Sequence, residues 1–322
     1  MFSYIVKLFY QKRGWRELRL FNARFLDDDS NFIGFLYADG TAINLTKAAA
    51  IYDVTVNAEA FALTVNSWTT IDELLRYFEN IREVVGTILD FVEVHNLLSE
   101  LRIQRSYQVV SPVLTPSKII CIGKNYVEHA KETGSEPPSE PVLFSKLPEC
   151  ITGHETKITW SKHLGRLDPE VELAVVIGRY TKNVRAADAF LYVAGYTILN
   201  DLTGRDLQSK FKQKGWPWFR AKNYENFAPM GPFLLLHDPN KDPNSFRLTL
   251  KVNGEVRQSE LCSEMIFKIP ELIETISAHV PLQPGDVIAT GTPSGIGPLA
   301  DGDIVECEIP EIGVLRNFIE IK

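Results

Sequence analysis

The chain has 322 residues, enough to bury a large core and to form two domains, or one domain with an appendage. Hydrophobic residues make up 45% and charged residues 23%, which is typical of a globular protein and excludes a disordered or fibrous chain. The formal net charge is −7 and no long Lys/Arg cluster occurs, so we expect no nucleic-acid partner. We also expect no membrane partner, because the sequence contains no long uncharged apolar span and no secretory signal pattern.

The four cysteines are widely separated and form no C-x-x-C pair, so they indicate neither a zinc site nor a redox motif. We interpret them as buried or incidental thiols in a reducing compartment. This interpretation predicts a cytoplasmic location.

The first third of the chain, residues 1–112, is predicted to be a small β-rich domain with a helix. Aromatic and β-branched residues fill the segments 3–10, 15–25 and 32–36, and turn-forming residues separate the last two. Helical spacing of apolar residues extends over residues 70–101, with Thr69 or Thr70 as the N-cap. The prolines in Ser111-Pro112 and Thr115-Pro116 mark the boundary to the second domain, residues 113–322.

Residues 168–178 read as a β-strand in which two carboxylates alternate with apolar residues. Period-two alternation places Glu170 and Glu172 on the same face, where their like charges repel each other. A solvated strand edge is one interpretation, and a divalent cation between the carboxylates is the other. Asp201 follows the next predicted strand, residues 193–199, as a third oxygen ligand, and the sequence alone makes Asp206 an equal candidate.

A predicted strand, residues 118–123, leads into a helix-like segment that ends at Gly134. His129 and Glu132 are three residues apart and share one helical face, so the carboxylate can orient the imidazole as a general base. A surface ion pair is the alternative interpretation. The proline-rich segment 136–141 is predicted to be a loop, where a lid would be placed.

Further polar groups follow in the second domain. Arg205 can bind a carboxylate through two hydrogen bonds, and Lys222 can add a point charge. The glycine-rich loop 291–297 lacks the order of a P-loop, so we expect its backbone N–H groups and the Thr292 hydroxyl to face a carboxylate. Asn253-Gly254 predicts a hairpin, and Pro270 predicts a break within the helical segment 263–278.

These motifs, in this order, resemble those of the fumarylacetoacetate hydrolase family. The matching stretches are residues 118–126, 141–146, 170–178, 192–201, 205–208, 252–255 and 285–295, which together span nearly all of residues 113–322. Residues 34–45 also resemble part of the smaller leading domain of that family. The resemblance implies a mostly β protein with some α: a mixed β-sandwich or β-roll catalytic domain after a smaller β-rich domain.

The resemblance also implies site residues, a metal and an oligomeric state. It implies Mg²⁺ or Mn²⁺, with Ca²⁺ as a further ion expected in crystals, and a homodimer. The expected metal ligands are Glu170, Glu172 and Asp201. The expected catalytic residues are His129, Glu132 and Lys222, and the expected substrate-binding residues are Tyr126, Arg205, Gln208, Gly291 and Thr292.

The resulting hypothesis is metal-dependent hydrolysis of a C–C bond in a 2,4-dioxo acid of the acylpyruvate or fumarylpyruvate type. A metal at the carboxylates would stabilise the enolate that leaves, and His129 with Glu132 would activate water. An isomerase or decarboxylase of 2-oxo or hydroxymuconate-type diacids, including oxaloacetate, is the alternative, because it needs the same enolate. A metal-binding scaffold without turnover is the third interpretation.

Overall fold

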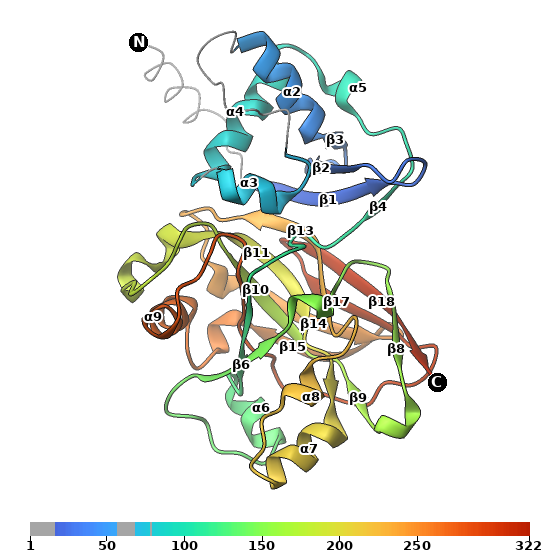
Figure 1. The fold of residues 1–322 in the computed structure, drawn as a ribbon, viewed down its shortest axis with the longest axis vertical. Coiled ribbons are helices and arrows are strands. Elements are labelled where there is room, and N and C mark those ends of the chain that lie inside the picture. Colours follow the sequence, from blue (N-terminus) through green and yellow to red (C-terminus); the bar gives the residue numbers. More distant parts are fainter. Residues whose placement is uncertain (1–16, 57–67, 78) are drawn as a thin grey trace.

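The structure, a computed structural model, describes residues 17–56, 68–77 and 79–322. Figure 1 shows a smaller N-terminal region packed at one end of a larger β-rich body. The predicted strand 3–10 and the start of the predicted strand 15–25 lie outside the described residues. The N-terminal region contains β1 (Arg19–Phe25), β2 (Asn31–Leu36), β3 (Ala42–Asn44), α2 (Leu45–Val56), α3 (Ile71–Tyr77), α4 (Ile81–Val94), α5 (Leu98–Leu101) and β4 (Tyr107–Val109).

The single helix predicted over residues 70–101 is wrong, because this segment forms α3, α4 and α5. Asn80 begins α4, since its side chain accepts a hydrogen bond from the backbone N–H of Glu83. Asn96 follows α4 with a φ of 56°, a left-handed conformation that ends helices. The predicted cap is confirmed: Thr70 Oγ1 accepts from the Glu73 backbone N–H, and the Glu73 carboxylate accepts from the Thr70 N–H. Helix α2 was not predicted.

The larger body is built mainly from strands. They are β5 (Ile119–Gly123), β6 (Val142–Lys146), β7 (Ile151–Thr152), β8 (Lys157–Trp160), β9 (Leu167–Asp168), β10 (Val171–Ile177), β11 (Val193–Asn200), β12 (Thr203–Gly204), β13 (Ala228–Leu236), β14 (Arg247–Val252), β15 (Glu255–Leu261), β16 (Val287–Ala289), β17 (Ile304–Ile309) and β18 (Gly313–Ile321). Its α-helices are α6 (Val127–Glu132), α7 (Arg205–Gln213), α8 (Phe219–Lys222) and α9 (Ile269–His279). Its short 3₁₀ helices are η2 (Pro148–Cys150), η3 (Lys162–Leu164), η4 (Ala186–Tyr192), η5 (Pro243–Ser245) and η6 (Cys262–Glu264).

Two mixed sheets pack against each other, which confirms the predicted fold class. The larger sheet has the strand order β3-β2-β1-β13-β11-β10-β16-β5-β6, and β4 and β7 pair at its side. The smaller one has the order β15-β14-β17-β18-β8. Strands β10, β11 and β13 contact β14, β17 and β18 of the second sheet, as in a β-sandwich. Because β1 pairs antiparallel with β13, the N-terminal strands extend the larger sheet.

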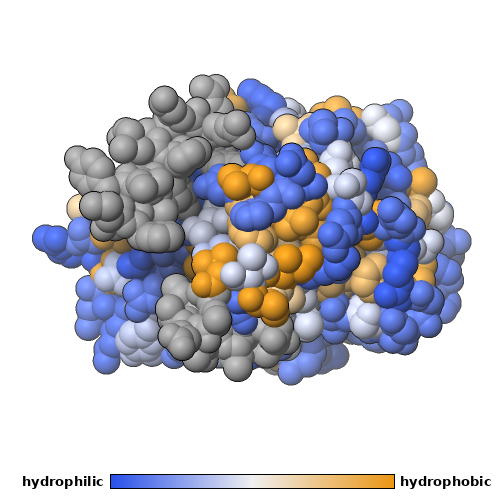
Figure 2. Space-filling model, turned by 90° about the horizontal axis from the view of Figure 1, so that it is seen from above, coloured by the Kyte–Doolittle hydropathy of each residue, from blue (hydrophilic) through white to orange (hydrophobic). Residues whose placement is uncertain are grey.

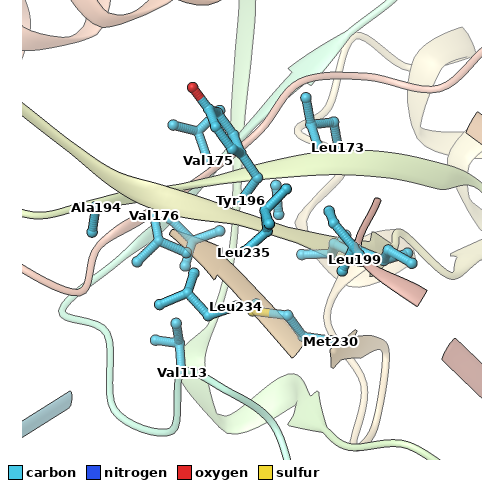
Figure 3. Packing of buried hydrophobic residues seen from close by; sticks show 14 of the residues in the cluster. Val113, Leu173, Val175, Val176, Ala194, Tyr196, Leu199, Met230, Leu234 and Leu235 are labelled. Atoms are coloured by element: carbon cyan, nitrogen blue, oxygen red, sulfur yellow. The ribbon is translucent and has the colours of Figure 1, made fainter. Parts of the chain in front are cut away.

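The strand with the two glutamates lies inside this sheet. Strand β10 is flanked by β11 and β16, and every residue from Val171 to Ile177 is buried. Figure 3 shows Val175 and Val176 among the hydrophobic side chains of β11 and β13 that form this core. A strand covered on both faces reads as a continuous apolar run, which explains the sequence pattern. The interpretation of residues 168–178 as a solvated strand edge is therefore wrong.

Several local predictions are confirmed. Asn253 and Gly254 have φ values of 53° and 82° and connect β14 to β15 as a hairpin turn. Helix α9 begins at Ile269, where the break was expected. The four cysteines, Cys121, Cys150, Cys262 and Cys307, are free and buried.

Outside the residues drawn in grey, the face of the molecule seen in Figure 2 is mainly hydrophilic. Figure 2 shows this face with a small group of hydrophobic residues near its centre. Among the described helices, none has the length and hydropathy that a membrane span requires.

Candidate metal centre and catalytic dyad

Three buried carboxylates meet where β10 begins and β11 ends. Antiparallel pairing of Val171 with Asn200 brings the neighbouring Glu170 and Asp201 together, and the Asp201 N–H donates to the Glu170 carbonyl at 2.8 Å. One carboxylate oxygen from each of Glu170, Glu172 and Asp201 lies within 4.8 Å of the other two. The predicted set of three carboxylates, here called the triad, is thus assembled by the fold.

The alternative ligand, Asp206, lies elsewhere. Its carboxylate accepts a hydrogen bond from the Arg166 backbone N–H at 3.0 Å, and it is not part of the triad. Sequence order could not decide between Asp201 and Asp206, because only the pairing of β10 with β11 determines which aspartate adjoins Glu170.

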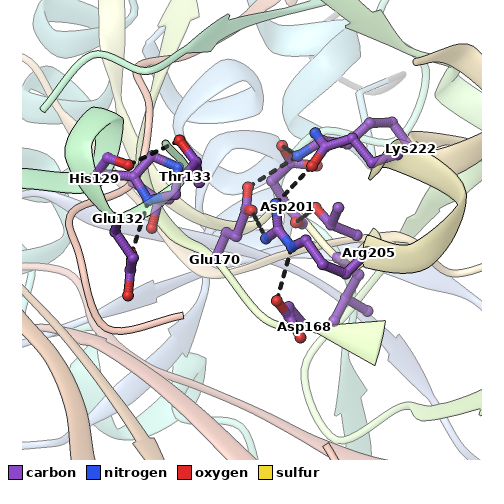
Figure 4. A network of polar contacts seen from close by, with 12 residues as sticks. His129, Glu132, Thr133, Asp168, Glu170, Asp201, Arg205 and Lys222 are labelled. Carbon is purple, nitrogen blue, oxygen red and sulfur yellow. Dashed lines mark hydrogen bonds and ion pairs between the residues drawn. The ribbon is translucent and has the colours of Figure 1, made fainter. Parts of the chain in front are cut away.

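Two lysines compensate part of the negative charge. Lys222 Nζ lies 2.9 Å from Glu170 Oε2 and 2.5 Å from Asp201 Oδ2. Lys146 Nζ lies 2.7 Å from Asp201 Oδ1 and also donates to the Lys222 carbonyl at 2.6 Å (Figure 4 shows the Lys222 contacts). Although burial opposes charge, Asp201 and Glu170 raise the pKa of Lys222, so its ammonium stays protonated. Sequence reasoning missed Lys146, because a lysine at a strand end is usually exposed.

Unlike Glu170 and Asp201, Glu172 has no lysine partner among the described residues. Its uncompensated charge makes the triad suitable for a divalent cation. Within the described residues its carboxylate forms no ion pair and accepts one hydrogen bond, from the Gly291 N–H at 2.9 Å. Burial, together with the charges of Asp201 and Glu170, raises the pKa of Glu172 well above its usual value. Carboxylate oxygens are the ligands that Mg²⁺ and Mn²⁺ prefer. A divalent cation bound at the triad would remove the repulsion between its three carboxylates.

Arg205 is held by groups of the protein itself. Its Nε donates to Asp168 at 2.8 Å, its Nη1 donates to Gln208 Oε1 at 2.7 Å, and its Nη2 contacts Glu170. Asp168 is also bound by Arg166 at 2.6 Å, a partnership that sequence reasoning missed. Arg205 and Gln208 both line the pocket beside the triad. The role of Arg205 and Gln208 as a substrate clamp stays a prediction. It rests on the guanidinium N–H groups of Arg205 that take part in none of these three contacts.

Of the two residues of the predicted dyad, His129 lines the same pocket. His129 Nδ1 lies 3.3 Å from Glu132 Oε2, and Glu132 accepts a further hydrogen bond from the Gly295 N–H at 3.1 Å. Partial burial opposes ionisation, but the contacts with His129 and Gly295 lower the pKa of Glu132. His129 is only 6% exposed, so it is not a surface ion-pair residue. Figure 4 shows the dyad on α6 opposite Glu170.

The three remaining predicted site residues, Thr292, Gly291 and Tyr126, differ in their position relative to the pocket. Thr292 lines the pocket, and its hydroxyl accepts a hydrogen bond from Gln258 at 2.9 Å. Gly291 adjoins the pocket through its N–H, which Glu172 uses. Tyr126 is 2% exposed, lies near Cys262 and is not among the residues that line the pocket. The pocket is lined by Ile122, Gly123, Lys124, His129, Thr133, Phe144, Glu170, Glu172, Asp201, Arg205, Gln208, Lys212, Trp218, Lys222 and Thr292.

Known proteins resemble this chain in sequence and in fold. Residues 118–320 match the family profile described as fumarylacetoacetate (FAA) hydrolase C-terminal. The human protein named oxaloacetate tautomerase FAHD2A, mitochondrial, is 41% identical over 217 residues, which cover 65% of this chain and 68% of that protein. The fumarylacetoacetate hydrolase of psychrophilic Exiguobacterium antarcticum superposes with a TM-score of 0.73 at 29% identity, covering 95% of this chain and 100% of that one.

A second similar solved structure is named as an isomerase and not as a hydrolase. The probable 2-hydroxyhepta-2,4-diene-1,7-dioate isomerase of Mycobacterium abscessus superposes with a TM-score of 0.72 at 28% identity, covering 95% of this chain and 99% of that one. Because the family profile covers well over half of the chain and contains the triad and the dyad, the chain is an enzyme of the fumarylacetoacetate hydrolase family.

Proposed function

We propose that the enzyme hydrolyses the C–C bond of a 2,4-dioxo acid of the acylpyruvate type. The observation that carries this proposal is that His129 and the triad line one pocket. A divalent cation held by Glu170, Glu172 and Asp201 would supply the Lewis acidity that an enolate leaving group requires. The residues of the chain then have to bind the acid, transfer one proton and balance the negative charges of the triad.

His129 acts as the base that takes a proton from water. Glu132 accepts from His129 Nδ1, which fixes the tautomer and leaves Nε2 as the proton acceptor. The water oxygen forms a bond to C4 of the substrate, the C3–C4 bond breaks, and its electron pair remains on C3. The proton then reaches C3, so that the products are a carboxylic acid and pyruvate, and one water is consumed.

An assay with a panel of acylpyruvates tests this function. With Mg²⁺ present we expect pyruvate and one equivalent of carboxylic acid to form, and with EDTA we expect no turnover. Oxaloacetate and a hydroxymuconate-type diacid complete the panel. If no acylpyruvate yields pyruvate in either metal condition, the hydrolase proposal is refuted.

Isomerisation or tautomerisation of a 2-oxo acid is the second candidate, and decarboxylation is a variant of it. The names of the human relative and of the M. abscessus structure favour this candidate. A base beside the triad is equally suited to take a proton from C3 of a 2-oxo acid and return it elsewhere. Loss of the enol absorbance without formation of pyruvate or CO₂ would identify this reaction in the same panel.

Three properties stay predictions of the family resemblance and the composition. They are the homodimer, the cytoplasmic location, and the choice between Mg²⁺ and Mn²⁺. Size-exclusion chromatography with light scattering tests the first, fractionation of the source cells tests the second, and metal titration tests the third.

A further inference from the structure

One buried glutamine of the smaller sheet joins β10 to the loop after β16. Gln258 lies on β15 and is only 1% exposed. Its Oε1 accepts a hydrogen bond at 3.0 Å from the N–H of Val171, the residue between the two glutamates of the triad. Its Nε2 donates to the Pro293 carbonyl at 2.7 Å and to Thr292 Oγ1 at 2.9 Å. One side-chain amide therefore contacts both the strand of the triad and a residue of the pocket wall.

The orientation of this amide is determined by its two backbone contacts. A backbone N–H can only donate and a carbonyl can only accept, so the amide oxygen of Gln258 must face Val171 and its nitrogen must face Pro293. An exchange of oxygen and nitrogen would bring two donors together and two acceptors together. The second N–H of the amide therefore points to Thr292 Oγ1.

This contact determines what the Thr292 hydroxyl can do. A hydroxyl has a single proton, and because Thr292 Oγ1 accepts from Gln258, that proton points away from the amide. Among the described residues no group accepts a hydrogen bond from the Thr292 O–H, although Thr292 is only 2% exposed and lines the pocket. The contact thus leaves the hydroxyl as a hydrogen-bond donor to a group that enters the pocket.

The residues before Thr292 hold the loop in place. The Gly291 N–H donates to Glu172 at 2.9 Å, and the Thr290 hydroxyl donates to the Leu173 carbonyl at 2.9 Å. Thr292 is therefore fixed by β10 on one side and by the glutamine of β15 on the other. A hydroxyl held in this way loses little conformational freedom when it binds a ligand oxygen.

We propose that Gln258 is a positioning residue that makes the Thr292 hydroxyl a fixed hydrogen-bond donor to the carboxylate of the bound acid. The inference rests on the proposed function in one respect, the binding of a 2-oxo acid in the pocket. Gln258 is not among the residues that line the pocket, so it acts on the acid through Thr292. Loss of its amide should weaken binding of the acid, while the base and the triad remain.

A double-mutant cycle tests the proposal. Gln258→Met keeps a side chain of similar length without an N–H donor, and Thr292→Val replaces the hydroxyl by a methyl group. The wild type, both single variants and the double variant are titrated with pyruvate at saturating Mg²⁺, by calorimetry on the full chain. Pyruvate is the product that all acylpyruvates have in common. Gln258→Asn, whose amide is shorter by one CH₂ group, takes the place of Gln258→Met if that variant does not fold.

We expect Thr292→Val to weaken pyruvate binding by about tenfold, the loss of one hydrogen bond to a charged group. Gln258→Met should weaken it by at least about threefold in the presence of the Thr292 hydroxyl. In the Thr292→Val background the same substitution should change the affinity by less than about twofold, because the group through which it acts is already absent. Thr292→Ser retains a hydroxyl and should stay within about twofold of the wild type.

A matched variant separates this role from a general loss of stability. Asn317 is 1% exposed, and its Nδ2 donates to the carbonyls of Gly153 and Thr156. Asn317→Leu therefore also removes a buried amide that binds two backbone groups, and Asn317 is not among the residues that line the pocket. We expect Asn317→Leu and Gln258→Met both to unfold at lower urea concentration than the wild type, and only Gln258→Met to bind pyruvate more weakly.

Three outcomes overturn the inference. If Gln258→Met weakens pyruvate binding equally with and without the Thr292 hydroxyl, the glutamine does not act through Thr292, and the proposed function stands. If Gln258→Met binds pyruvate like the wild type, the amide does not position the hydroxyl, and the proposed function again stands. If the wild type does not bind pyruvate at saturating Mg²⁺, no 2-oxo acid binds in the pocket, and the proposed function fails together with the inference.

Discussion

Glu172 differs from the other members of the triad in how its charge is balanced. Lys222 contacts Glu170 and Asp201, whereas Glu172 relies on the Gly291 N–H. A buried carboxylate with one hydrogen bond and two negative neighbours favours its protonated form. A divalent cation must therefore displace a proton from this site before all three carboxylates can act as ligands.

Proton release on metal binding is the first prediction. Because the pKa of Glu172 is raised, Mg²⁺ competes with a proton below that pKa, and the affinity for Mg²⁺ rises with pH by up to about tenfold per pH unit. Calorimetry in two buffers of different ionisation enthalpy should give up to one proton released per Mg²⁺. Glu172→Gln should bind Mg²⁺ more weakly and release no proton; an affinity independent of pH in the wild type would contradict this account.

The residues of the triad show which part of a site a sequence can predict. Glu170 and Glu172 were predictable because alternation along one strand determines their common face. Lys146 was not, because its role depends on the contacts of its Nζ with Asp201 and with the Lys222 carbonyl, which lie 55 and 76 residues away along the chain. Charge compensation between distant elements leaves no local pattern.

At the scale of elements, the loop after β16 joins the triad to the dyad. The Gly291 N–H donates to Glu172, and the Gly295 N–H donates to Glu132. The sequence predicted that this loop presents N–H groups to a carboxylate, and these two N–H groups bind carboxylates of the protein itself. Its conformation therefore positions a metal ligand and the partner of the base together.

Gly295→Ala is the second prediction. Gly295 has a φ of 104°, and a Cβ there would lie 1.9 Å from the Arg257 carbonyl oxygen, so the loop must shift. We expect a loss of at least about 2 kcal/mol in the free energy of unfolding, together with reduced turnover, because Glu132 loses its N–H partner. Urea denaturation and the acylpyruvate assay measure the two effects.

Gly285→Ala is the control for backbone strain alone. Gly285 has a φ of 88°, and nothing lies within 4 Å of a Cβ placed there. We expect a loss of about 1 kcal/mol with unchanged turnover. Equal effects of the two substitutions on turnover would show that the loop does not position the dyad.

At the scale of the molecule, buried polar side chains of the N-terminal region hold the segment that leads into the catalytic body. Asn22 Nδ2 donates to the carbonyls of Ser111 and Pro112 at 3.1 Å each, and its Oδ1 accepts from the Ile71 N–H. The Asp72 carboxylate accepts from the Leu114 N–H. The segment is thus fixed by side chains of β1 and α3.

Asn22→Ala is the third prediction. It leaves the Ile71 N–H and two carbonyls without their buried partner, which costs about 1–3 kcal/mol in the free energy of unfolding. The affinity for Mg²⁺ should not change, since Asn22 does not contact the triad. Urea denaturation and calorimetry on the same protein measure both quantities, and a variant of wild-type stability would contradict the role given to Asn22.

The order of the β-strands was the part of the fold that no local pattern could predict. The resemblance of residues 113–322 to a known family implied the sandwich, and alternation identified β10. The pairing of β1 with β13 joins Arg19 to Leu235 across more than 200 residues, and no periodicity within either segment specifies it. Likewise, helices α3, α4 and α5 read as one helix, because their apolar spacing continues across the breaks.

The measurement that tests the central claim most directly uses His129→Ala, assayed for acylpyruvate turnover and for Mg²⁺ binding on one preparation. We predict a kcat lower by roughly 10²–10⁴-fold, because the proton acceptor is lost, and an unchanged affinity for Mg²⁺, because the triad is intact. Turnover at the wild-type rate would contradict the claim that this histidine and the buried carboxylates form one active site.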